Sequence, residues 1–272
     1  MRVIIAGLGF MGASLARSIH RAGNHTVVGV DIDPAARAAA LASGANQVYA
    51  SLSDFDWLCD VIVFATPAGV TISLLPANAP RLKRTPLVMD IGSVKGPVMQ
   101  AARAAGLERV FVGTNPVCIR ESTGFDAARA DLYDGTPVWL VADDDAPVDA
   151  AEIFWRIAGA AALRRTDADA HDALIGAASH LPQLVASVLA GTLADLAIAR
   201  ERLGPAGRDA TRLAGSNPAT AVDMLMQNRA SLLDPLARFA DRLQRVRRAL
   251  DRGDENELRS LLDEAAMWQR HR

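Results

Sequence analysis

The first 166 residues alternate between short, continuously apolar runs and stretches in which apolar residues recur every three or four positions. Continuous runs fit strands that are buried on both faces, and the longer spacing fits amphipathic helices. The runs predict strands at 3–6, 26–30, 47–49, 61–65, 87–91, 110–112 and 138–141. Helices are expected between them, one opened by the glycine-rich segment 7–12 and others at 34–41, 69–77, 95–105 and 147–158. Strands that alternate with helices predict a parallel sheet covered on both faces, which is a doubly wound Rossmann-type α/β domain.

The pattern changes after Thr166. Residues 167–272 show only helical periodicity, interrupted near 204–207 and 215–218. We therefore divide the chain into an α/β domain at 1–166 and an all-helical domain at 167–272. The helices are rich in Ala and Leu and more apolar than a lone bundle of this size needs. Part of their surface should be buried against a second copy, so we expect a homodimer through the helical domain.

Composition narrows the class of protein. Of the 272 residues, 50% are hydrophobic and 22% are charged, which fits a folded chain. A net charge of -2 provides no basic surface for nucleic acid and no polybasic patch for a membrane, so neither partner is expected. Apolar segments are too short or too interrupted for a membrane span or a signal peptide. Two cysteines, Cys59 and Cys118, are too few for a disulfide framework, and there is no cluster of metal ligands, so we expect a cytoplasmic protein without a metal.

The segment Gly-Leu-Gly-Phe-Met-Gly, residues 7–12, follows the first strand and opens the first helix. In this context Gly7 allows a tight turn, Gly9 lets the backbone approach a pyrophosphate, and Gly12 permits close packing of helix on strand. The pyrophosphate would lie at the helix N-terminus, where free backbone amides attract anions. The segment predicts a dinucleotide site that includes Phe10 and Met11.

Asp31 ends the second strand, 19 residues after Gly12. At that position a carboxylate can accept hydrogen bonds from both hydroxyls of the adenosine ribose. Its charge would repel the 2′-phosphate of NADP, and Arg37 is the nearest basic residue that follows it. NAD is therefore expected in preference to NADP.

Further informative stretches lie at strand ends and at the domain junction, where open α/β folds bind ligands. They are Asp-Ile-Gly-Ser-Val-Lys at 90–95, Gly-Thr-Asn-Pro-Val-Cys-Ile-Arg-Glu-Ser-Thr-Gly at 113–124, and Ser-His-Leu-Pro-Gln at 179–183, with His-Asp at 171–172. Others are Ala-Thr-Pro at 65–67, Ala-Asp-Leu-Tyr-Asp-Gly at 130–135, Arg-Asp-Ala-Thr-Arg-Leu at 208–213, Asn-Pro at 217–218 and Asn-Arg at 228–229. As an ordered set, these motifs resemble the prephenate and arogenate dehydrogenase family over nearly the whole chain. The resemblance implies NAD(P)-dependent oxidative decarboxylation of a prephenate-type cyclohexadiene to an aromatic pyruvate or amino acid, a step of tyrosine-type biosynthesis.

The resemblance also implies roles for single residues. It places Ser93 beside the nicotinamide and the 4-substituent of the substrate ring, although Ser93 could equally cap a helix that begins at Val94. It places Thr66 and Pro67 against the cofactor. Arg212 is our choice as the partner of a substrate carboxylate, because a guanidinium binds a carboxylate in bidentate fashion.

For each of four further residues, two interpretations remain open. Arg208 competes with Arg212, and either arginine could lie on the surface of a helix. The resemblance places His171 and His180 near the active site, but a spacing of nine puts them on opposite faces of a regular helix, and each alone would fit a structural histidine. Glu121 either orders the loop after Asn115 or is exposed.

Two positions depart from the family pattern. The family's Gly-Thr-His-Pro motif holds a histidine that accepts a hydrogen bond from the substrate's 4-hydroxyl, and this position is Asn115. A carboxamide cannot take up a proton at physiological pH, so Asn115 cannot act as that base. The family's Ser-His-Leu-Pro-His is here Ser-His-Leu-Pro-Gln, so Gln183 replaces a histidine that contacts the substrate side chain.

Three interpretations follow from these departures. In the first, which we favour, the substrate is 4-amino-4-deoxyprephenate and the product 4-aminophenylpyruvate, a precursor of antibiotic-type metabolites. Its amine pushes electrons better than a hydroxyl and can donate to the oxygen of Asn115. In the second, the chain is a prephenate or arogenate dehydrogenase that is slow or has its base elsewhere. In the third, it is a catalytically weakened NAD-binding sensor or scaffold.

A related class of oxidoreductase also opens with Gly-Leu-Gly-x-Met-Gly. These β-hydroxyacid dehydrogenases carry a catalytic lysine in their helical domain. No lysine follows Lys95 in this chain, which argues against that class.

Overall fold

The structure is a computed structural model that describes residues 1–118, 125 and 127–270. Within them, eight strands form one sheet in the order β3-β2-β1-β4-β5-β6-β7-β8. The strands are β1 (Arg2–Ala6), β2 (Thr26–Val30), β3 (Gln47–Tyr49), β4 (Val61–Phe64), β5 (Leu87–Asp90), β6 (Phe111–Pro116), β7 (Pro137–Val141) and β8 (Ala162–Arg165). The order 3-2-1-4-5-6 is that of a Rossmann-type doubly wound sheet, which confirms the expected fold class.

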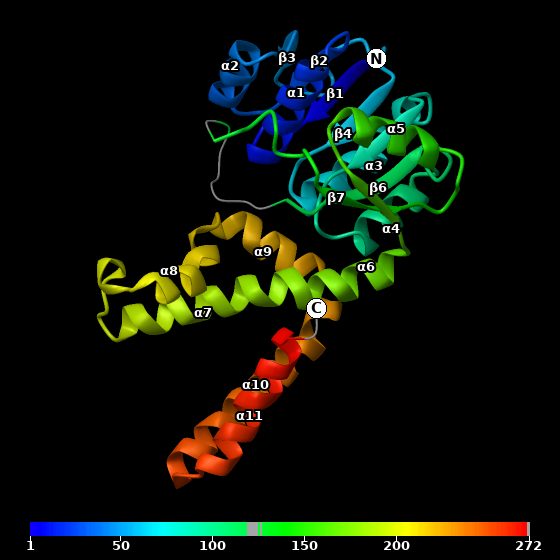
Figure 1. Cartoon of the computed structure of the whole chain (residues 1–272). Helices are drawn as coiled ribbons and strands as arrows, with labels where there is room; N and C mark the ends of the chain where they lie inside the picture. The colour runs from blue at the N-terminus through cyan, green and yellow to red at the C-terminus, as the bar shows by residue number, and fades with distance from the viewer. Residues whose placement is uncertain (119–124, 126, 271–272) are drawn as a thin grey trace.

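Helices cover both faces of this sheet (Figure 1). Successive residues of a strand point to opposite faces, so Val3 and Ile5 pack on one side and Ile4 and Ala6 on the other. The first face carries α1 (Phe10–Ala22), α2 (Pro34–Ala42) and α5 (Val148–Ile157). The second face carries α3 (Ala68–Leu82) and α4 (Gly96–Ala104). Each strand that is apolar throughout is therefore buried on both sides, as its sequence predicts.

The far edge of the sheet differs from the expected parallel arrangement. β7 runs antiparallel to β6, with Asn115 opposite Trp139. An additional strand, β8, pairs in parallel with β7. The sequence pattern missed β8 because this edge strand, Ala-Leu-Arg-Arg, is half-exposed and ends in two arginines, so it lacks a continuous apolar run.

The remainder of the chain is helical. It is interrupted at 203–204 and 216–217, at or next to the breaks that the sequence predicts, and also at 196–199, where Ala197 has a positive φ and the sequence pattern predicts no break. The elements are α6 (Ala168–Ile175), the π-helical η1 (Gly176–His180), α7 (Leu181–Asp195), η2 (Arg200–Arg202), α8 (Pro205–Thr211), η3 (Arg212–Gly215), α9 (Pro218–Gln227), α10 (Arg229–Arg252) and α11 (Glu255–Arg270). In Figure 1, α6 and α7 form one long rod, α8 and α9 fold back along it, and α10 and α11 form a hairpin that extends away.

The helix Ala168–Asp195 is, in length and composition, the one span among the described residues that could cross a membrane. Only 28% of its apolar window is buried in a single copy of the chain. At its beginning, however, it buries His171, Asp172 and His180 against neighbouring elements of the same chain. This helix therefore combines a polar end at the domain junction with an apolar, uncovered remainder.

Candidate active site

The turn between β1 and α1 provides a cradle for a dinucleotide. Gly7 has a φ of +96°, and a side chain at Gly12 would come within 1.9 Å of the carbonyl oxygen of Gly7, so both positions require glycine. Apart from Gly9 and its neighbours along the chain, no atom of the described residues lies within 4 Å of the place where a side chain of Gly9 would begin. The backbone is thus open at Gly9, next to the N-terminus of α1, as close approach of a pyrophosphate requires. Phe10 and Met11 form the first turn of this helix.

Asp31 lies at the carboxyl end of β2, beside the glycine turn. Its Oδ2 accepts the amide hydrogen of Leu8 at 2.6 Å, and its Oδ1 accepts that of Asp33 at 2.8 Å. These bonds hold the carboxylate where the adenosine ribose of a dinucleotide would lie. Arg37 donates instead to the carbonyl oxygens of Asp31 and Ile32, at 2.8 and 3.0 Å, so its guanidinium is bound to the main chain. Ile32, which sequence reasoning did not select, is 90% exposed beside this site.

Thr66 and Pro67 connect β4 to α3 next to the glycine turn. A side chain at Gly7 would come within 2.8 Å of the backbone of Ala65, which shows how closely the two turns approach. Thr66 Oγ1 hydrogen-bonds to Thr71 Oγ1 at 2.8 Å, and Pro67 precedes the first turn of α3. The glycine turn, Asp31 and this connection together fit a bound dinucleotide.

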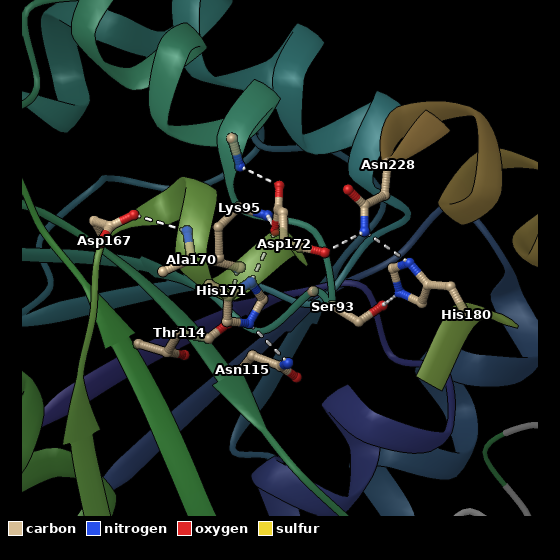
Figure 2. Close-up of polar contacts among 12 residues, drawn as sticks. Ser93, Lys95, Thr114, Asn115, Asp167, Ala170, His171, Asp172, His180 and Asn228 are labelled. Carbon is tan, nitrogen blue, oxygen red and sulfur yellow. Dashed lines mark hydrogen bonds and ion pairs between the residues drawn. The ribbon is translucent and has the colours of Figure 1, made fainter. Parts of the chain in front are cut away.

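Asn115 is near the end of β6 and is 5% exposed. Its Nδ2 lies 3.0 Å from Nε2 of His171, and Nδ1 of His171 lies 2.8 Å from Oδ1 of Asp172 (Figure 2). Asp172 also accepts the amide hydrogens of Lys95 and Gly96, at 2.8 and 2.7 Å. Its carboxylate therefore caps the N-terminus of α4 and orients the imidazole that contacts Asn115.

The environment of Asp172 favours its ionised form. Burial raises the pKa of this carboxyl group, but the hydrogen bonds with His171, Gly96 and Lys95 outweigh burial and hold the pKa below its usual range. Asp172 is thus an anion that accepts three hydrogen bonds.

A buried ion pair supports the strand that carries Asn115. Lys95 donates to Oδ2 of Asp90 and, at 2.8 Å, to the carbonyl oxygen of Thr114, and both charged side chains are at most 2% exposed. Burial raises the pKa of Asp90 and lowers the pKa of Lys95, in each case against the attraction of the partner's charge. Sequence reasoning missed this pair, although Asp90 and Lys95 delimit one of the motifs quoted above.

Ser93 hydrogen-bonds to a second buried imidazole. Its Oγ lies 3.2 Å from Nε2 of His180, while Nδ1 of His180 lies 3.0 Å from Nδ2 of Asn228. The same Nδ2 donates to the carbonyl oxygen of Asp172 at 3.0 Å, which links the two imidazoles. The expectation that Ser93 caps a helix is wrong, because α4 begins only at Gly96 and Asp172 supplies the cap. Sequence reasoning gave Asn228 no role.

The two histidines enter one network because the helix between them is not regular. Their nine-residue spacing predicts opposite faces at 3.6 residues per turn. Residues Gly176–His180 instead form a π-helical turn, which contains more residues per turn and rotates His180 toward the side of His171. The expectation of opposite faces assumes 3.6 residues per turn throughout, and this assumption does not hold for the segment.

Gln183 binds a neighbouring turn of the helical part. Its Nε2 donates to the carbonyl oxygen of Leu213 at 2.8 Å, and its Oε1 accepts the hydroxyl of Ser216 at 3.0 Å. Both ends of the amide thus bind the turn at 212–216, so Gln183 clasps the segment that begins with Arg212. Arg212 is exposed in the described chain. Arg208 lines a hollow with Arg200 and Glu201, away from the polar network, and Glu121 lies outside the described residues.

Family models and known proteins match most of the chain. The nucleotide-binding domain of prephenate dehydrogenase matches residues 15–162, and the dimerisation domain of prephenate dehydrogenase matches residues 167–264. A cyclohexadienyl dehydrogenase of Zymomonas mobilis is 30% identical over 261 residues, which cover 91% of this chain and 88% of the relative. A prephenate dehydrogenase of Bacillus subtilis is 27% identical, with 94% and 72% covered. The crystal structure of Aquifex aeolicus prephenate dehydrogenase, in complex with hydroxyphenyl propionate and NAD+, superposes with a TM-score of 0.88 at 27% identity and covers 99% of this chain and 97% of that one.

Proposed function

The chain belongs to the prephenate dehydrogenase family of NAD(P)-dependent oxidoreductases, and from this premise we propose that it oxidises prephenate or arogenate with NAD. The relatives named above support a 4-hydroxy substrate more than the 4-amino substrate that the sequence led us to favour. The observation within this chain that carries the proposal is the buried network around Asn115 and Ser93. It places two polar side chains from the ends of the sheet against residues of the helical part.

The reaction makes modest demands on the residue beside the 4-substituent. NAD, when bound, accepts the hydride that leaves ring carbon 4. Cleavage of the bond to the ring carboxylate releases CO2 and supplies the electron pair that completes the aromatic ring. The 4-hydroxyl carries a proton in the product, so polarising the O–H bond is sufficient, and any proton that a base accepts in this step has to return to the oxygen. A hydrogen-bond acceptor can do this, although more weakly than a base.

Asn115 supplies such an acceptor. Its amide nitrogen faces His171, which leaves its carbonyl oxygen for a ligand. Ser93, at the other arm of the network, can contact the same substituent or the nicotinamide. A neutral oxygen assists a hydroxyl less than a histidine does, so the loss of imidazole should cost rate while preserving the reaction.

A 4-amino substrate is the second candidate, and Asn115 is the observation that favours it. Nitrogen donates its lone pair to the ring more readily than oxygen, so 4-amino-4-deoxyprephenate depends less on a base. The carbonyl oxygen of Asn115 can accept one of its N–H bonds. The identity of residue 115 is thus compatible with both substituents.

The uncovered apolar surfaces support a homodimer through the helical part. Family membership supplies a dimerisation domain at 167–264. Large apolar side chains lie exposed on the same helices, among them Val188, Leu233, Leu243, Leu250 and Trp268. We infer that a second copy covers them, since exposed patches of this kind mark interfaces. Size-exclusion chromatography with light scattering should give twice the mass of 28.8 kDa.

A parallel assay decides among the substrates. Purified protein receives NAD or NADP with prephenate, arogenate or 4-amino-4-deoxyprephenate, and formation of the reduced cofactor is followed by absorbance. We expect turnover of a 4-hydroxy substrate with NAD. Turnover of the 4-amino compound alone would establish the second candidate. NAD binding without turnover of any of the three would contradict both and indicate a sensor or scaffold.

A further inference from the structure

The two ends of the Asn115 amide have different surroundings. Nδ2 lies 3.0 Å from Nε2 of His171, whereas Oδ1 has no hydrogen-bond partner among the described residues. Oδ1 is also not one of the fully buried atoms without a partner, which within that part of the chain are Arg17 Nε, Asp90 Oδ1 and Trp155 Nε1. The oxygen therefore reaches solvent, and Figure 2 shows it pointing away from His171.

Asp172 determines which nitrogen of His171 carries the proton. The carboxylate accepts the amide hydrogens of Lys95 and Gly96 and can only accept from a third partner. Nδ1 of His171, 2.8 Å from Oδ1 of Asp172, must therefore be the protonated nitrogen. In the neutral ring Nε2 then carries a lone pair, and it can only accept a hydrogen bond.

That tautomer also determines the orientation of Asn115. With Nε2 as an acceptor, Asn115 has to present its NH2 group to His171. The flipped amide would set the carbonyl oxygen against the imidazole lone pair at about 3 Å in a buried position, an arrangement of two acceptors without a hydrogen.

The second imidazole has the opposite tautomer. Asn228 Nδ2 donates to the carbonyl oxygen of Asp172, so the same NH2 group donates to Nδ1 of His180. Neutral His180 then carries its proton on Nε2 and donates it to Ser93 Oγ. The hydroxyl hydrogen of Ser93 remains available as a donor. The two arms thus end in an acceptor at Asn115 and a donor at Ser93.

We propose that Asp172 and His171 are positioning residues that lock the Asn115 amide with its oxygen toward solvent, so that the site selects rings whose 4-substituent carries an O–H or N–H. This inference rests on the proposed function for its ligand, a para-substituted ring. The orientation of the Asn115 amide is a property of the free protein and does not depend on the proposed function.

The first test is NMR of uniformly 15N-labelled protein without ligand near pH 7.5. The 15N shift separates protonated from unprotonated ring nitrogens, and His171→Gln and His180→Gln identify the two spin systems. We expect the proton on Nδ1 in His171 and on Nε2 in His180. A His171 ring that is protonated on Nε2, on both nitrogens or on a rapidly exchanging mixture would overturn the locked orientation, whether or not the protein is active.

The second test is binding to the NAD-loaded protein by calorimetry. The probes are 4-hydroxyphenylpropionate and 4-fluorophenylpropionate, which have similar shape while fluorine donates no hydrogen bond. We expect the hydroxy probe to bind ~10-fold more tightly, because the fluoro probe leaves Oδ1 of Asn115 desolvated and unpaired. Equal affinity, or preference for fluorine, would contradict an outward oxygen.

Variants of residue 171 test whether His171 causes the preference for the hydroxy probe over the fluoro probe. His171→Leu removes the acceptor and should reduce the ratio of the two affinities to below ~3-fold. His171→Gln can still accept from Asn115 through its amide oxygen and should keep most of the ratio. His20→Gln, an exposed position on α1, is the matched control and should leave the ratio unchanged. A ratio that survives in a folded His171→Leu protein would show that His171 does not position Asn115. If neither probe binds the wild-type protein, the proposed function is wrong, and the tautomers measured by NMR still decide the orientation.

Discussion

Both carboxylate oxygens of Asp223 lie 3.2 Å from the backbone nitrogen of Gly69, so a side chain of α9 caps the N-terminus of α3. A side chain at position 69 would begin 2.6 Å from Oδ1 of Asp223, so the carboxylate would have to move away from this contact. The cap connects the helical part to the end of the connection that carries Thr66 and Pro67. A residue outside the nucleotide-binding domain therefore stabilises one edge of the cofactor site.

Removal of this cap should weaken both stability and cofactor binding. We expect Asp223→Ala to cost about 1 kcal/mol of unfolding free energy, or about 2–4 °C in Tm, because a helix N-terminus loses a charged cap. The Kd for NAD, measured by fluorescence quenching, should rise a few-fold. Asp223→Asn keeps one acceptor, so its Tm and its Kd for NAD should lie between those of the wild-type protein and those of Asp223→Ala. An unchanged Tm in the alanine variant would show that water replaces the cap without cost.

The hydrogen bonds of Gln183 to the turn at 212–216 predict an effect on substrate binding. Gln183→Met has a similar volume but cannot bind the carbonyl oxygen of Leu213 or the hydroxyl of Ser216. The turn that begins with Arg212 should loosen, so its guanidinium would be less well placed for a substrate carboxylate. We therefore expect KM for the substrate to rise ~10-fold with a smaller change in kcat. Arg202→Ala, an exposed arginine near the same helices, is the control. A fall in kcat at constant KM would mean that Gln183 acts at the ring instead.

Most of the α/β fold could be predicted from the sequence, because a strand buried on both faces appears there as a continuous apolar run. β4 is apolar throughout, β1 is apolar after Arg2, and both lie inside the sheet, so their continuous apolar runs predict them directly. The antiparallel direction of β7 could not be predicted, because the residues of a strand do not show in which direction the adjacent strand runs. β8 is half-exposed at the edge, and its two arginines remove the apolar signal.

For the site, too, the sequence predicts which residues take part but not how they are arranged. Motifs identified Asn115, Ser93, His171 and His180 because each follows a strand end or a distinctive sequence. Their mutual geometry was not readable, since a π-helical turn changes the rotation between the two histidines. The partners of Gln183 lie 30 and 33 residues away in the sequence and depend on how the helices pack. Local pattern therefore found the participants, and tertiary packing decided their roles.

Replacement of Asn115 by histidine tests whether the chain can recover a base. Histidine at this position can donate one ring N–H to Nε2 of His171 and keep the other nitrogen as an acceptor toward the ring. General-base catalysis contributes ~10²–10⁴-fold where it operates, so we expect kcat for prephenate to rise at least ~10-fold. The rate for 4-amino-4-deoxyprephenate should change less. Asn115→Ala, which has no acceptor, should lower both rates, and a histidine variant that is folded but slower on prephenate would contradict the argument.

Asp31 should control the choice of cofactor. Asp31→Ser removes the charge that repels a 2′-phosphate and the acceptor for the amide of Leu8. We expect KM for NAD to rise ~10-fold and the preference of NAD over NADP, as the ratio of kcat/KM values, to shrink by more than that factor. The same replacement at Asp33, two residues along the chain, keeps a capping oxygen for α2 and should leave the ratio unchanged. A wild-type enzyme that prefers NADP would refute the role of Asp31.

Asp172 should make stability depend on pH in the acid range. Its pKa is depressed in the folded protein, so the unfolded chain binds a proton first as pH falls. The stabilisation by its ionised form is therefore fully present above the unfolded value of 3.8 and is lost progressively as pH drops from there through the folded pKa. Asp172→Asn cannot titrate, and its amide cannot accept from Nδ1 of His171, Lys95 and Gly96 as a carboxylate does. In urea titrations we expect the wild-type protein to exceed the variant by about 2 kcal/mol at pH 6 and the difference to shrink steadily below pH ~4. A difference that stays constant down to pH ~2.5 would mean that the carboxylate contributes through packing alone, and the hydrogen bonds to the amides of α4 would not be the source of its stabilisation.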